Sequence, residues 1–357
     1  MAYLDANATE PLRPAARTAV LAALDLPGNP SSVHSAGRAA RRMLEDAREA
    51  VAARFGLASP DVVFTSGGTE ANALAVHALG AGRRVLAGAT EHDSVRAAAP
   101  DARVVPVDGD GVVDLAALAA LLDGPPALVC LMHANNETGT LHPIDRVAAL
   151  CRAAGALLHV DAVQSAGRMA LGFRADSIAL SSHKMGGPKG AGALLLAPGL
   201  AVAPLIPGGG QERGRRGGTP ALPAIAGFAA AAQVPPPDLA ALRDRAEAAA
   251  VSAGAVVLGA TWRLGNTTCL ALAGVRAETQ VIALDLAGVQ VSAGAACSSG
   301  KVARSHVLAA MGSGALAGEA IRVSLPWNAS AADVDAFAAA YAAMAARLAP
   351  HLARRAA

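Results

Sequence analysis

The fold of this chain is decided by the stretch Ser181-Ser182-His183-Lys184-Met185-Gly186-Gly187-Pro188-Lys189-Gly190. Lysine is otherwise almost absent, since Lys301 is the third and last lysine among 30 Lys and Arg residues. A guanidinium stays protonated, whereas a desolvated lysine amine can lose its proton and attack a carbonyl carbon. A lysine that persists in so arginine-rich a chain indicates a position where arginine cannot act. Lys184 is therefore predicted to form a Schiff base, and a surface salt bridge is the alternative role.

Length and composition predict a soluble protein of two domains. The 357 residues exceed the ~150 that are typical of one domain. We expect a large domain at 12–234 and a small domain made of 1–11 and 235–357. The composition break at Pro235-Pro236-Pro237-Asp238 marks the boundary, and Asp238 is the expected N-cap of the next helix.

Charge and hydropathy give no reason to expect a nucleic acid or a membrane as partner. The formal net charge is only +2, and alanine supplies most of the hydrophobic 53%. The longest uncharged run, 190–211, is interrupted by three prolines and therefore does not read as a membrane-spanning helix. The N-terminus lacks a basic region followed by an apolar one, so we expect a cytoplasmic protein.

The four cysteines favour reduced thiols over a metal site or a disulfide framework, because none forms a C-x-x-C pair. Cys130, Cys151 and Cys269 lie in apolar runs and are expected to pack in the core. Cys297 lies among small and polar residues, with Lys301 four positions later. Nearby cations favour the thiolate, so Cys297 is the candidate nucleophile.

Short apolar strands alternate with helices, which predicts an α/β sheet with a large parallel component. The expected strands are 61–65, 85–86, 104–107, 127–132, 156–160, 177–180 and 191–196. Polar groups follow several strand ends, at Glu91-His92, Asn135-Asn136-Glu137, Asp161 to Gln164 and Ser181 to Lys184. Ligands of open α/β sheets bind beyond the carboxyl ends of strands, so these groups should converge.

Towards the C-terminus the same alternation continues on a smaller scale. We expect helices at 238–253, 278–286 and 305–311, strands at 267–272, 290–292 and 320–325, and a final alanine-rich helix. The stripe Val334, Phe337, Tyr341 and Met344 has helical spacing and should face the core.

Three further segments carry local predictions. The strand at 61–65, the loop Ser66-Gly67-Gly68 and a helix that Thr69 would cap resemble a phosphate-binding arrangement, although such turns are often structural. A helix at 35–55 should present a solvated charged face that includes Arg48. The glycine- and arginine-rich segment 208–219 suits a flexible surface loop, or an anion site at a subunit contact.

A pyridoxal phosphate cofactor on Lys184 would need further groups that the sequence contains. A carboxylate must keep the ring nitrogen protonated, and Asp161 is the candidate. Gln164 can donate to the ring oxygen, and an imidazole can cover the ring face. The phosphate would contact Gly68 and Thr69 together with Ser181 and His183.

Together these motifs resemble the cysteine desulfurases of the class V aminotransferase family, in the NifS/IscS-like group with a long mobile Cys-loop. The resemblance extends over essentially the whole chain, through Tyr3-Leu4-Asp5, Gly28-Asn29-Pro30-Ser31-Ser32-Val33-His34, Thr65 to Glu70, Thr90-Glu91-His92, Asn135-Asn136-Glu137, His159 to Gln164, Ser182-His183-Lys184, Gly210-Gln211-Glu212-Arg213, Ala296-Cys297-Ser298-Ser299 and Ile321-Arg322. It implies the α/β fold of pyridoxal-phosphate-dependent transferases of fold type I: a large cofactor-binding domain with a mostly parallel seven-stranded sheet, and a smaller α/β domain with the Cys loop.

The resemblance also implies a reaction and a role for each site residue. L-Cysteine would become L-alanine, with its sulfur left as a persulfide on Cys297 for iron–sulfur cluster assembly or another sulfur-transfer pathway. The implied partners are a second copy of the chain in a homodimer and a sulfur-acceptor protein, either an iron–sulfur scaffold or a sulfurtransferase. The implied site consists of Lys184 holding pyridoxal phosphate, Asp161 at the ring nitrogen, Gln164 at the ring oxygen, His92 stacked on the ring, Gly68, Thr69, Ser181 and His183 at the phosphate with Thr219 from the partner, and Asn136 and Arg322 at the substrate carboxylate.

Some features depart from the family pattern. Glu10 stands where threonine is common and Gln211 where histidine is common, and the chain ends at Ala357, soon after its last helix, which leaves the sulfur acceptor open. Alternative readings are another class V enzyme, an aminotransferase or selenocysteine lyase, or a non-enzymatic scaffold relative.

Overall fold

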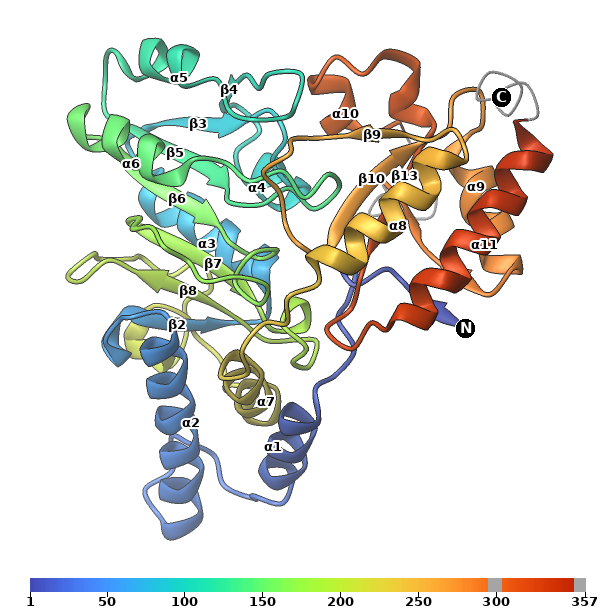
Figure 1. Ribbon diagram of the computed structural model, residues 1–357. Helices are drawn as coiled ribbons and strands as arrows, with labels where there is room; N and C mark the ends of the chain where they lie inside the picture. Colours follow the sequence, from blue (N-terminus) through green and yellow to red (C-terminus); the bar gives the residue numbers. More distant parts are fainter. Residues whose placement is uncertain (295–303, 350–357) are drawn as a thin grey trace.

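The computed structural model describes residues 1–294 and 304–349. A large sheet with its helices fills the left side of Figure 1, and a smaller group of strands and helices lies at the right, together with the N-terminus. Within the described residues, no helix combines the length and the apolar character needed to cross a membrane.

The large sheet has seven strands in the order β2-β8-β7-β6-β5-β3-β4. Only β8 runs against the others, so the predicted mostly parallel seven-stranded sheet is confirmed. The strands are β2 (Val62–Thr65), β3 (Arg84–Gly88), β4 (Arg103–Val105), β5 (Ala127–Met132), β6 (Leu157–Asp161), β7 (Ser177–Ser181) and β8 (Gly192–Leu196).

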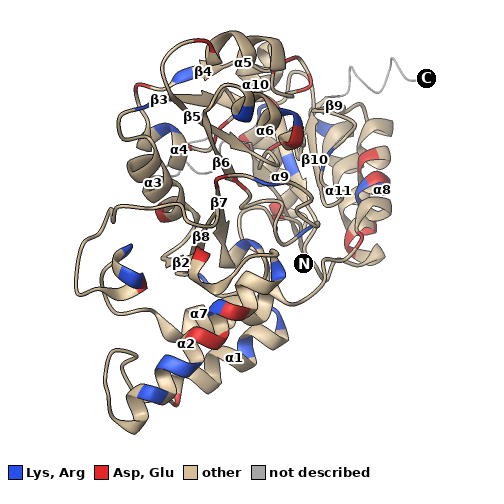
Figure 2. Ribbon diagram, turned by 90° about the vertical axis from the view of Figure 1, so that its left-hand side faces the viewer, with Lys and Arg blue, Asp and Glu red and all other residues tan. Residues whose placement is uncertain are grey.

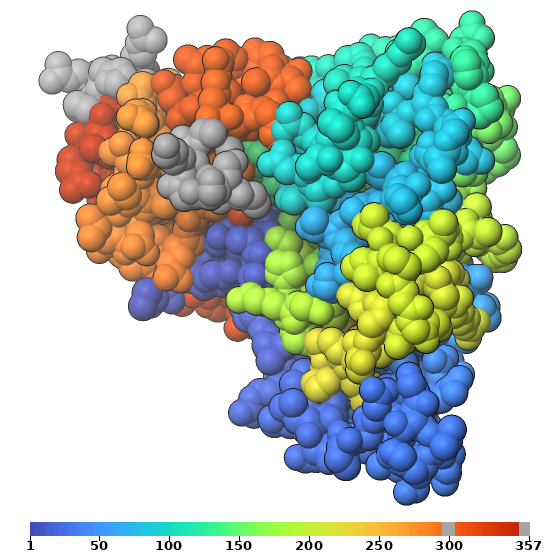
Figure 3. Space-filling view, turned by 180° about the vertical axis from the view of Figure 1, so that it is seen from behind, coloured from blue at the N-terminus to red at the C-terminus, as the bar shows by residue number. Residues whose placement is uncertain are grey.

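Helices cover both faces of this sheet, which is why its central strands are apolar on both sides. One face packs against α2 (Ser35–Arg54), α5 (Leu115–Leu122), α6 (Ile144–Ala153) and α7 (Leu222–Ala232). The other packs against α3 (Gly68–Leu79) and α4 (Asp93–Ala98). The remaining helix of this half, α1 (Pro14–Leu24), packs on α7, and Figure 3 shows the N-terminal helices projecting from the lower end of the molecule.

The smaller group is built on a four-stranded antiparallel sheet in the order β12-β13-β10-β9, beside a parallel pair of β1 and β11. Its elements are β1 (Ala2–Tyr3), α8 (Ala240–Ser252), β9 (Val256–Leu258), β10 (Thr267–Ala271), α9 (Ala277–Leu286), β11 (Val289–Gln290), β12 (Ser292–Ala293), α10 (His306–Ala310), β13 (Ala320–Ser324) and α11 (Ala331–Leu348). Short 3-10 turns complete the chain at Ser59–Asp61, Ser182–Lys184, Gln211–Gly214 and Gly314–Gly318.

This half has its own core, in which the predicted stripe of α11 is buried. Two local predictions for it were wrong. The single strand expected at 290–292 is two short strands, because Gln290 pairs with Tyr3 while Ser292 pairs with Arg322 in the other sheet. The N-cap of α8 is Leu239, although Asp238 accepts a hydrogen bond from the backbone of Ala240. The domain boundaries at 11/12 and 234/235 stay a prediction.

The charged face expected for α2 is wrong for one residue, Arg48. Arg38, Arg41, Arg42, Asp46 and Glu49 are exposed as predicted, and Figure 2 shows these charges along the helix. Arg48 is instead buried under the sheet, where its Nη1 and Nη2 donate to the Glu212 carboxylate at 2.6 and 2.8 Å. The spacing of α2 could not reveal this, since the partner lies 164 positions away.

The flexible surface loop expected at 208–219 is also wrong, because Glu212 is fixed in place. Its carboxylate accepts a third hydrogen bond, 2.8 Å from the backbone nitrogen of Phe64 in β2. Glu212 and Arg213 both adopt left-handed backbone angles, with φ of 48° and 60°. Such angles are unfavourable for residues other than glycine, and the buried ion pair stabilises them here. The segment is therefore anchored to the large sheet.

Candidate functional site

A cavity of 620 Å³ lies at the carboxyl ends of the parallel strands, a size that suits a cofactor with a small substrate. Each of the strand-end groups that were expected to converge contributes lining residues here, although Glu91, Asn135 and Glu137 do not line the cavity, and the small half adds Ser292 and Arg322. Among the predicted site residues, those that line it are Gly68, Thr69, His92, Asn136, Asp161, Gln164, Ser181, His183, Lys184 and Arg322.

Lys184 ends the 3-10 turn that follows β7, and its half-buried side chain enters the cavity. Its Nζ donates to the backbone carbonyl oxygens of Asn7 and Ala8 at 2.5 and 2.8 Å. The N-terminal segment therefore places the amine, which explains why a segment so far away in sequence belongs to the site.

Asp161 is the last residue of β6, and both of its carboxylate oxygens are held by donors. Oδ1 accepts from the backbone nitrogen of Val163 at 2.9 Å, and Oδ2 accepts from the Asn72 amide at 2.7 Å. Two donors fix the plane of the carboxylate. Asp161 can therefore present a fixed negative charge to a protonated ring nitrogen.

The turn before α3 forms the predicted phosphate-binding end of the cavity, with one correction. The N-cap is Gly67 and not Thr69, so no side chain caps this helix. Gly67 has φ 155° and ψ −177°, angles that only glycine adopts readily, and a Cβ on Gly68 would lie 2.6 Å from the Val163 side chain. The glycines therefore bring the helix start, with its free N–H groups, against the sheet. Thr69 lies in the first turn and is exposed.

His183 lies at the same end of the cavity, and its Nδ1 is 2.9 Å from the hydroxyl of Thr9. Burial, followed by the positive charges of Lys184 and Lys189, lowers the pKa of His183 to about 4. The imidazole is therefore neutral near neutral pH, and it can serve a phosphate as a hydrogen-bond donor.

His92 is the N-cap of α4, and its Nδ1 accepts from the backbone nitrogen of Ser94 at 3.0 Å. A backbone N–H can only donate, so the proton of a neutral His92 is on Nε2. The side chain lines the cavity, where an imidazole can stack on an aromatic ring.

Gln164 lines the cavity one turn after Asp161, as predicted. Its Nε2 donates to the carbonyl of Asn7 at 3.0 Å and retains a second N–H. Its buried Oε1 has no hydrogen-bond partner within the described ranges. The second N–H is therefore the group that can donate to a ring oxygen.

Arg322 reaches the cavity from β13 with a side chain that is 3% exposed. Its Nη2 donates to Asp5 at 2.6 Å, and its Nη1 donates to the Asn136 carbonyl at 3.1 Å. Its buried Nε lacks a partner among the residues that the structure describes. A carboxylate ligand would satisfy it, so Arg322 is suited to bind one.

Thr219 is exposed and does not line the cavity of its own chain. The loop that carries it is tied to α3, because Arg216 Nε donates to Glu70 Oε1 at 2.8 Å. This placement leaves the role of Thr219 toward a second subunit as a prediction.

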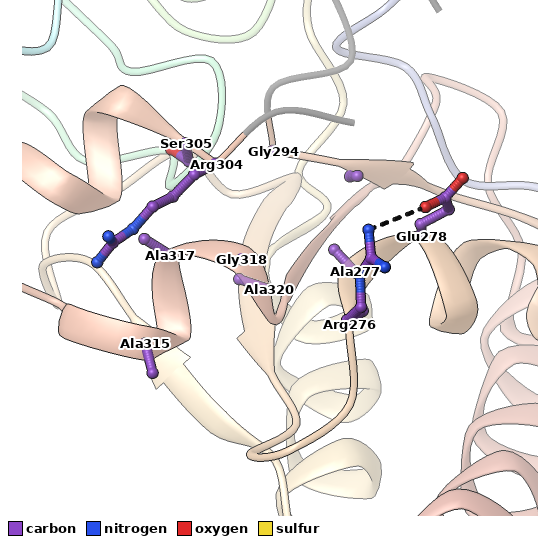
Figure 4. A pocket seen from close by; sticks show the side chains of 11 residues that line it. Arg276, Ala277, Glu278, Gly294, Arg304, Ser305, Ala315, Ala317, Gly318 and Ala320 are labelled. Atoms are coloured by element: carbon purple, nitrogen blue, oxygen red, sulfur yellow. Dashed lines mark hydrogen bonds and ion pairs between the residues drawn. The ribbon is translucent and has the colours of Figure 1, made fainter. Parts of the chain in front are cut away.

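Cys297 lies outside the described residues. The flanking residues Gly294 and Arg304 border a second cavity of 350 Å³ between α9 and α10, which Figure 4 shows with Arg276 and Glu278 at its rim. The other three cysteines are buried, as predicted for core residues. Burial raises the pKa of each of these thiols, to about 12 for Cys151, which makes them poor nucleophiles.

Several polar residues of the site were missed from the sequence. Asn72 and His159 are fully buried behind Asp161, and Ser94 joins Asn72 to His92. The sequence feature that could have revealed such a residue is a polar side chain inside an otherwise apolar element, as in Leu157-Leu158-His159-Val160. Asp5 was missed because its partner Arg322 is 317 positions away.

The fixed carboxylate, the lysine amine, the neutral histidines and the glycine cradle together fit pyridoxal phosphate. The family model for class V aminotransferases matches residues 2–337, and the chain belongs to this family. It is 43% identical to a cysteine desulfurase of Cereibacter sphaeroides, covering 93% of this chain and 92% of that protein. It is 38% identical to an IscS-like cysteine desulfurase of Mycobacterium tuberculosis, covering 94% of each.

The fold comparison agrees with the sequence comparison. A NifS-like protein from Rickettsia africae superposes with a TM-score of 0.89 at 32% identity, covering 96% of this chain and 99% of that one. The predicted family and the predicted fold class, fold type I of the pyridoxal-phosphate-dependent transferases, are therefore confirmed.

Proposed function

We propose that this chain is a cysteine desulfurase, which converts L-cysteine to L-alanine and transfers the sulfur to a protein thiol. The observation that carries the proposal is one cavity that holds the Lys184 amine, the Asp161 carboxylate and the Arg322 guanidinium. The names of the relatives support the same activity.

The proposed cofactor is pyridoxal 5'-phosphate. Lys184 would bind it covalently, Asp161 would pair with its ring nitrogen, Gln164 with its ring oxygen, and His92 would cover the ring. The phosphate would use the remaining residues of that end of the cavity, Gly68, Thr69, Ser181 and His183. When bound, pyridoxal phosphate supplies an electron sink for the electron pair released at the substrate α-carbon.

Two residues of the chain would move protons. The Lys184 amine is the proposed base for the substrate α-proton, and the carbonyls of Asn7 and Ala8 hold it by accepting its hydrogen bonds. His92 carries a proton on Nε2, so it is the proposed acid on the other side of the site. Both residues line the same cavity.

Arg322 and Asn136 are the proposed ligands of the substrate carboxylate. A guanidinium binds a carboxylate with charge-assisted hydrogen bonds, and Arg322 lines the cavity with an Nε that has no partner among the described residues. Fixing the carboxylate orients the remaining bonds of the α-carbon, which is how such a site selects an α-amino acid.

Cys297 is the proposed sulfur acceptor. Its thiolate attacks the substrate sulfur, a new S–S bond forms, and the C–S bond breaks with its electron pair left on carbon. Protonation of that carbon gives alanine, so the sum is L-cysteine plus enzyme thiol to L-alanine plus enzyme persulfide. The persulfide would pass its outer sulfur to an acceptor protein, an iron–sulfur scaffold or a sulfurtransferase.

The proposal extends to assembly and location. We propose a cytoplasmic homodimer in which Thr219 of each subunit contacts the cofactor phosphate of the other. We also propose two domains, 12–234 as the cofactor-binding domain and 1–11 with 235–357 as the small domain. Limited proteolysis near 234/235 that releases a folded 12–234 fragment would support this division.

The decisive test is incubation of the purified protein with L-cysteine and a reductant, with alanine and sulfide measured together. Equal amounts of both products are expected, and Lys184→Ala should abolish them. Cys297→Ser should bind cysteine but release no alanine. If Lys184→Ala made alanine at the wild-type rate, or the wild type made pyruvate from alanine faster than it released sulfide, the proposal would be wrong.

A further inference from the structure

Asn72 lies on α3 in the cavity wall, and its buried amide contacts residues from two other elements, β6 and α4. Its Nδ2 donates to Asp161 Oδ2 at 2.7 Å and to Ser94 Oγ at 2.8 Å. Its Oδ1 is 3.0 Å from His159 Nε2. Both amide protons and the amide oxygen are therefore in use.

These contacts determine where the protons lie on one side of Asn72. The Asp161 carboxylate only accepts, so the amide nitrogen faces it and the amide oxygen faces His159. His159 therefore carries its proton on Nε2, and its Nδ1 accepts from the Ser177 hydroxyl at 2.8 Å. Burial lowers the pKa of His159 to about 4, so the ring stays a neutral donor to Asn72.

On the other side the same amide orients a hydroxyl. Ser94 Oγ accepts from Asn72, which leaves the hydroxyl proton free to point at His92 Nδ1, 2.9 Å away. The backbone nitrogen of Ser94 donates to the same Nδ1 at 3.0 Å. His92 Nδ1 thus accepts from two donors and carries no proton of its own. The ring proton is on Nε2.

We propose that Asn72 is a positioning residue that couples the Asp161 carboxylate to the hydrogen bonding of His92 Nδ1 through its single amide group. The inference rests on the proposed function, in which both residues face pyridoxal phosphate. Asn72 lines the cavity beside both residues and acts by orienting the Asp161 carboxylate and the Ser94 hydroxyl that faces His92 Nδ1. Losing it should therefore change both groups at once.

The experiment uses Asn72→Ala and, as the matched variant, Ser94→Ala, which removes one branch only. Each protein is loaded with pyridoxal phosphate labelled with ¹⁵N in its ring, and with ¹⁵N-histidine. The ring-nitrogen and His92 signals are recorded without substrate. The kcat and KM for cysteine are then measured on the same samples.

Asn72→Ala should move the ring nitrogen toward its unprotonated signal and also shift His92 Nδ1. Ser94→Ala should shift only the His92 signal. In Asn72→Ala we expect kcat to fall roughly 10- to 100-fold with a smaller change in KM, the effect of losing a hydrogen bond to a charged group. A folded Asn72→Ala with wild-type signals would overturn the proposal.

The outcomes separate this inference from the proposed function. A wild type that binds no pyridoxal phosphate would contradict the proposed function itself. A wild type that binds it and forms alanine, with both variants spectroscopically unchanged, contradicts the role of Asn72 alone. If Asn72→Ala does not fold, Ser94→Ala decides, because an unchanged His92 signal in that variant would overturn the coupling.

Discussion

Two buried arginines of this molecule bind carboxylates, and they differ in how completely they are satisfied. Every nitrogen of Arg48 donates: to Glu45, to the Val62 carbonyl and to both oxygens of Glu212. Both side chains of the Arg48–Glu212 pair are 3% exposed. In the Arg322–Asp5 pair, Arg322 is equally buried, Asp5 is 20% exposed, and the guanidinium retains an Nε without a partner in the described part of the chain.

The difference separates a structural pair from a pair that can bind a ligand. Removing charges from water is unfavourable, and only full hydrogen bonding offsets that cost. The pair of Arg48 meets this condition within the protein and so fixes the segment around Glu212 on the sheet. The pair of Arg322 does not, and Arg322 lines the candidate active site. Arg322 therefore combines an unsatisfied donor with a place in the candidate active site.

The largest effect should come from breaking the structural pair. Arg48→Ala leaves the Glu212 charge buried and unpaired, so we expect a loss of about 3–5 kcal/mol in the free energy of unfolding. Urea unfolding measures it. The control is Arg42→Ala, an exposed arginine on the same helix, which should change stability by less than about 0.5 kcal/mol. Equal effects in the two variants would contradict the comparison.

Mild acid should act through a different set of buried groups. Burial lowers the pKa of His142 and of His159 from 6.5 to about 4. The unfolded chain therefore binds more protons than the folded one between these values, and stability falls as the pH drops from 6.5 toward 4. At pH 5 each histidine should cost on the order of 2 kcal/mol relative to pH 7. Unfolding free energies that are flat from pH 7 to 5 would refute this.

Arg322→Gln tests the pair that is proposed to bind substrate. The glutamine can still form neutral hydrogen bonds but lacks the charge, so kcat/KM for cysteine should fall roughly 10- to 100-fold. The unfolding free energy should change much less than in Arg48→Ala, since Asp5 retains contact with water. Steady-state kinetics and urea unfolding on the same preparation check both statements. A large loss of stability with unchanged kinetics would assign Arg322 to structure.

Asp5→Asn should give the smallest effect. Asp5 competes with a substrate carboxylate for Arg322, and a partly exposed ion pair contributes about 1 kcal/mol or less. Neutralising it should therefore lower the KM for cysteine roughly two- to fivefold. Asp93→Asn, in an exposed ion pair with Arg96, is the control and should leave KM unchanged. A raised KM in Asp5→Asn would show that Asp5 mainly orients Arg322.

The sheet and the strand-end groups could be predicted because they depend on local patterns. Apolar runs bounded by turns predict buried strands, and the polar residues that follow them must lie at one edge of a parallel sheet. Lys184 was predicted because lysine is rare in this chain and because a deprotonated amine can attack a carbonyl carbon. The rest of its site, Asp161 to Gln164 and Ser181 to His183, lies close to it in sequence or in the next strand.

The contacts between distant segments could not be predicted in this way. Arg48 looks like its exposed neighbours on α2, and nothing in its spacing points to Glu212. Asn72 and His159 are hydrogen-bonded across 87 positions. The hydrogen bond between Asn72 and the Ser94 hydroxyl can be recognised only once the fold has brought these residues together. The N-cap at Gly67 was misassigned because threonine is the stronger capping residue, whereas the backbone there requires glycine.

The pairing of the first strand with a late one also sets when the active site can be completed during synthesis. The backbone of Asn7 hydrogen-bonds to Ser324, a contact that spans 317 positions. The large sheet ends at Leu196 and can form while the ribosome is still at work, but β1 must wait for β11. At ~5–20 residues per second, Asn7 waits roughly 15–60 s for its partner. The carbonyl groups that hold the Lys184 amine therefore settle only after Ser324 has been synthesised, and we expect a nascent chain to gain its cofactor only after that point.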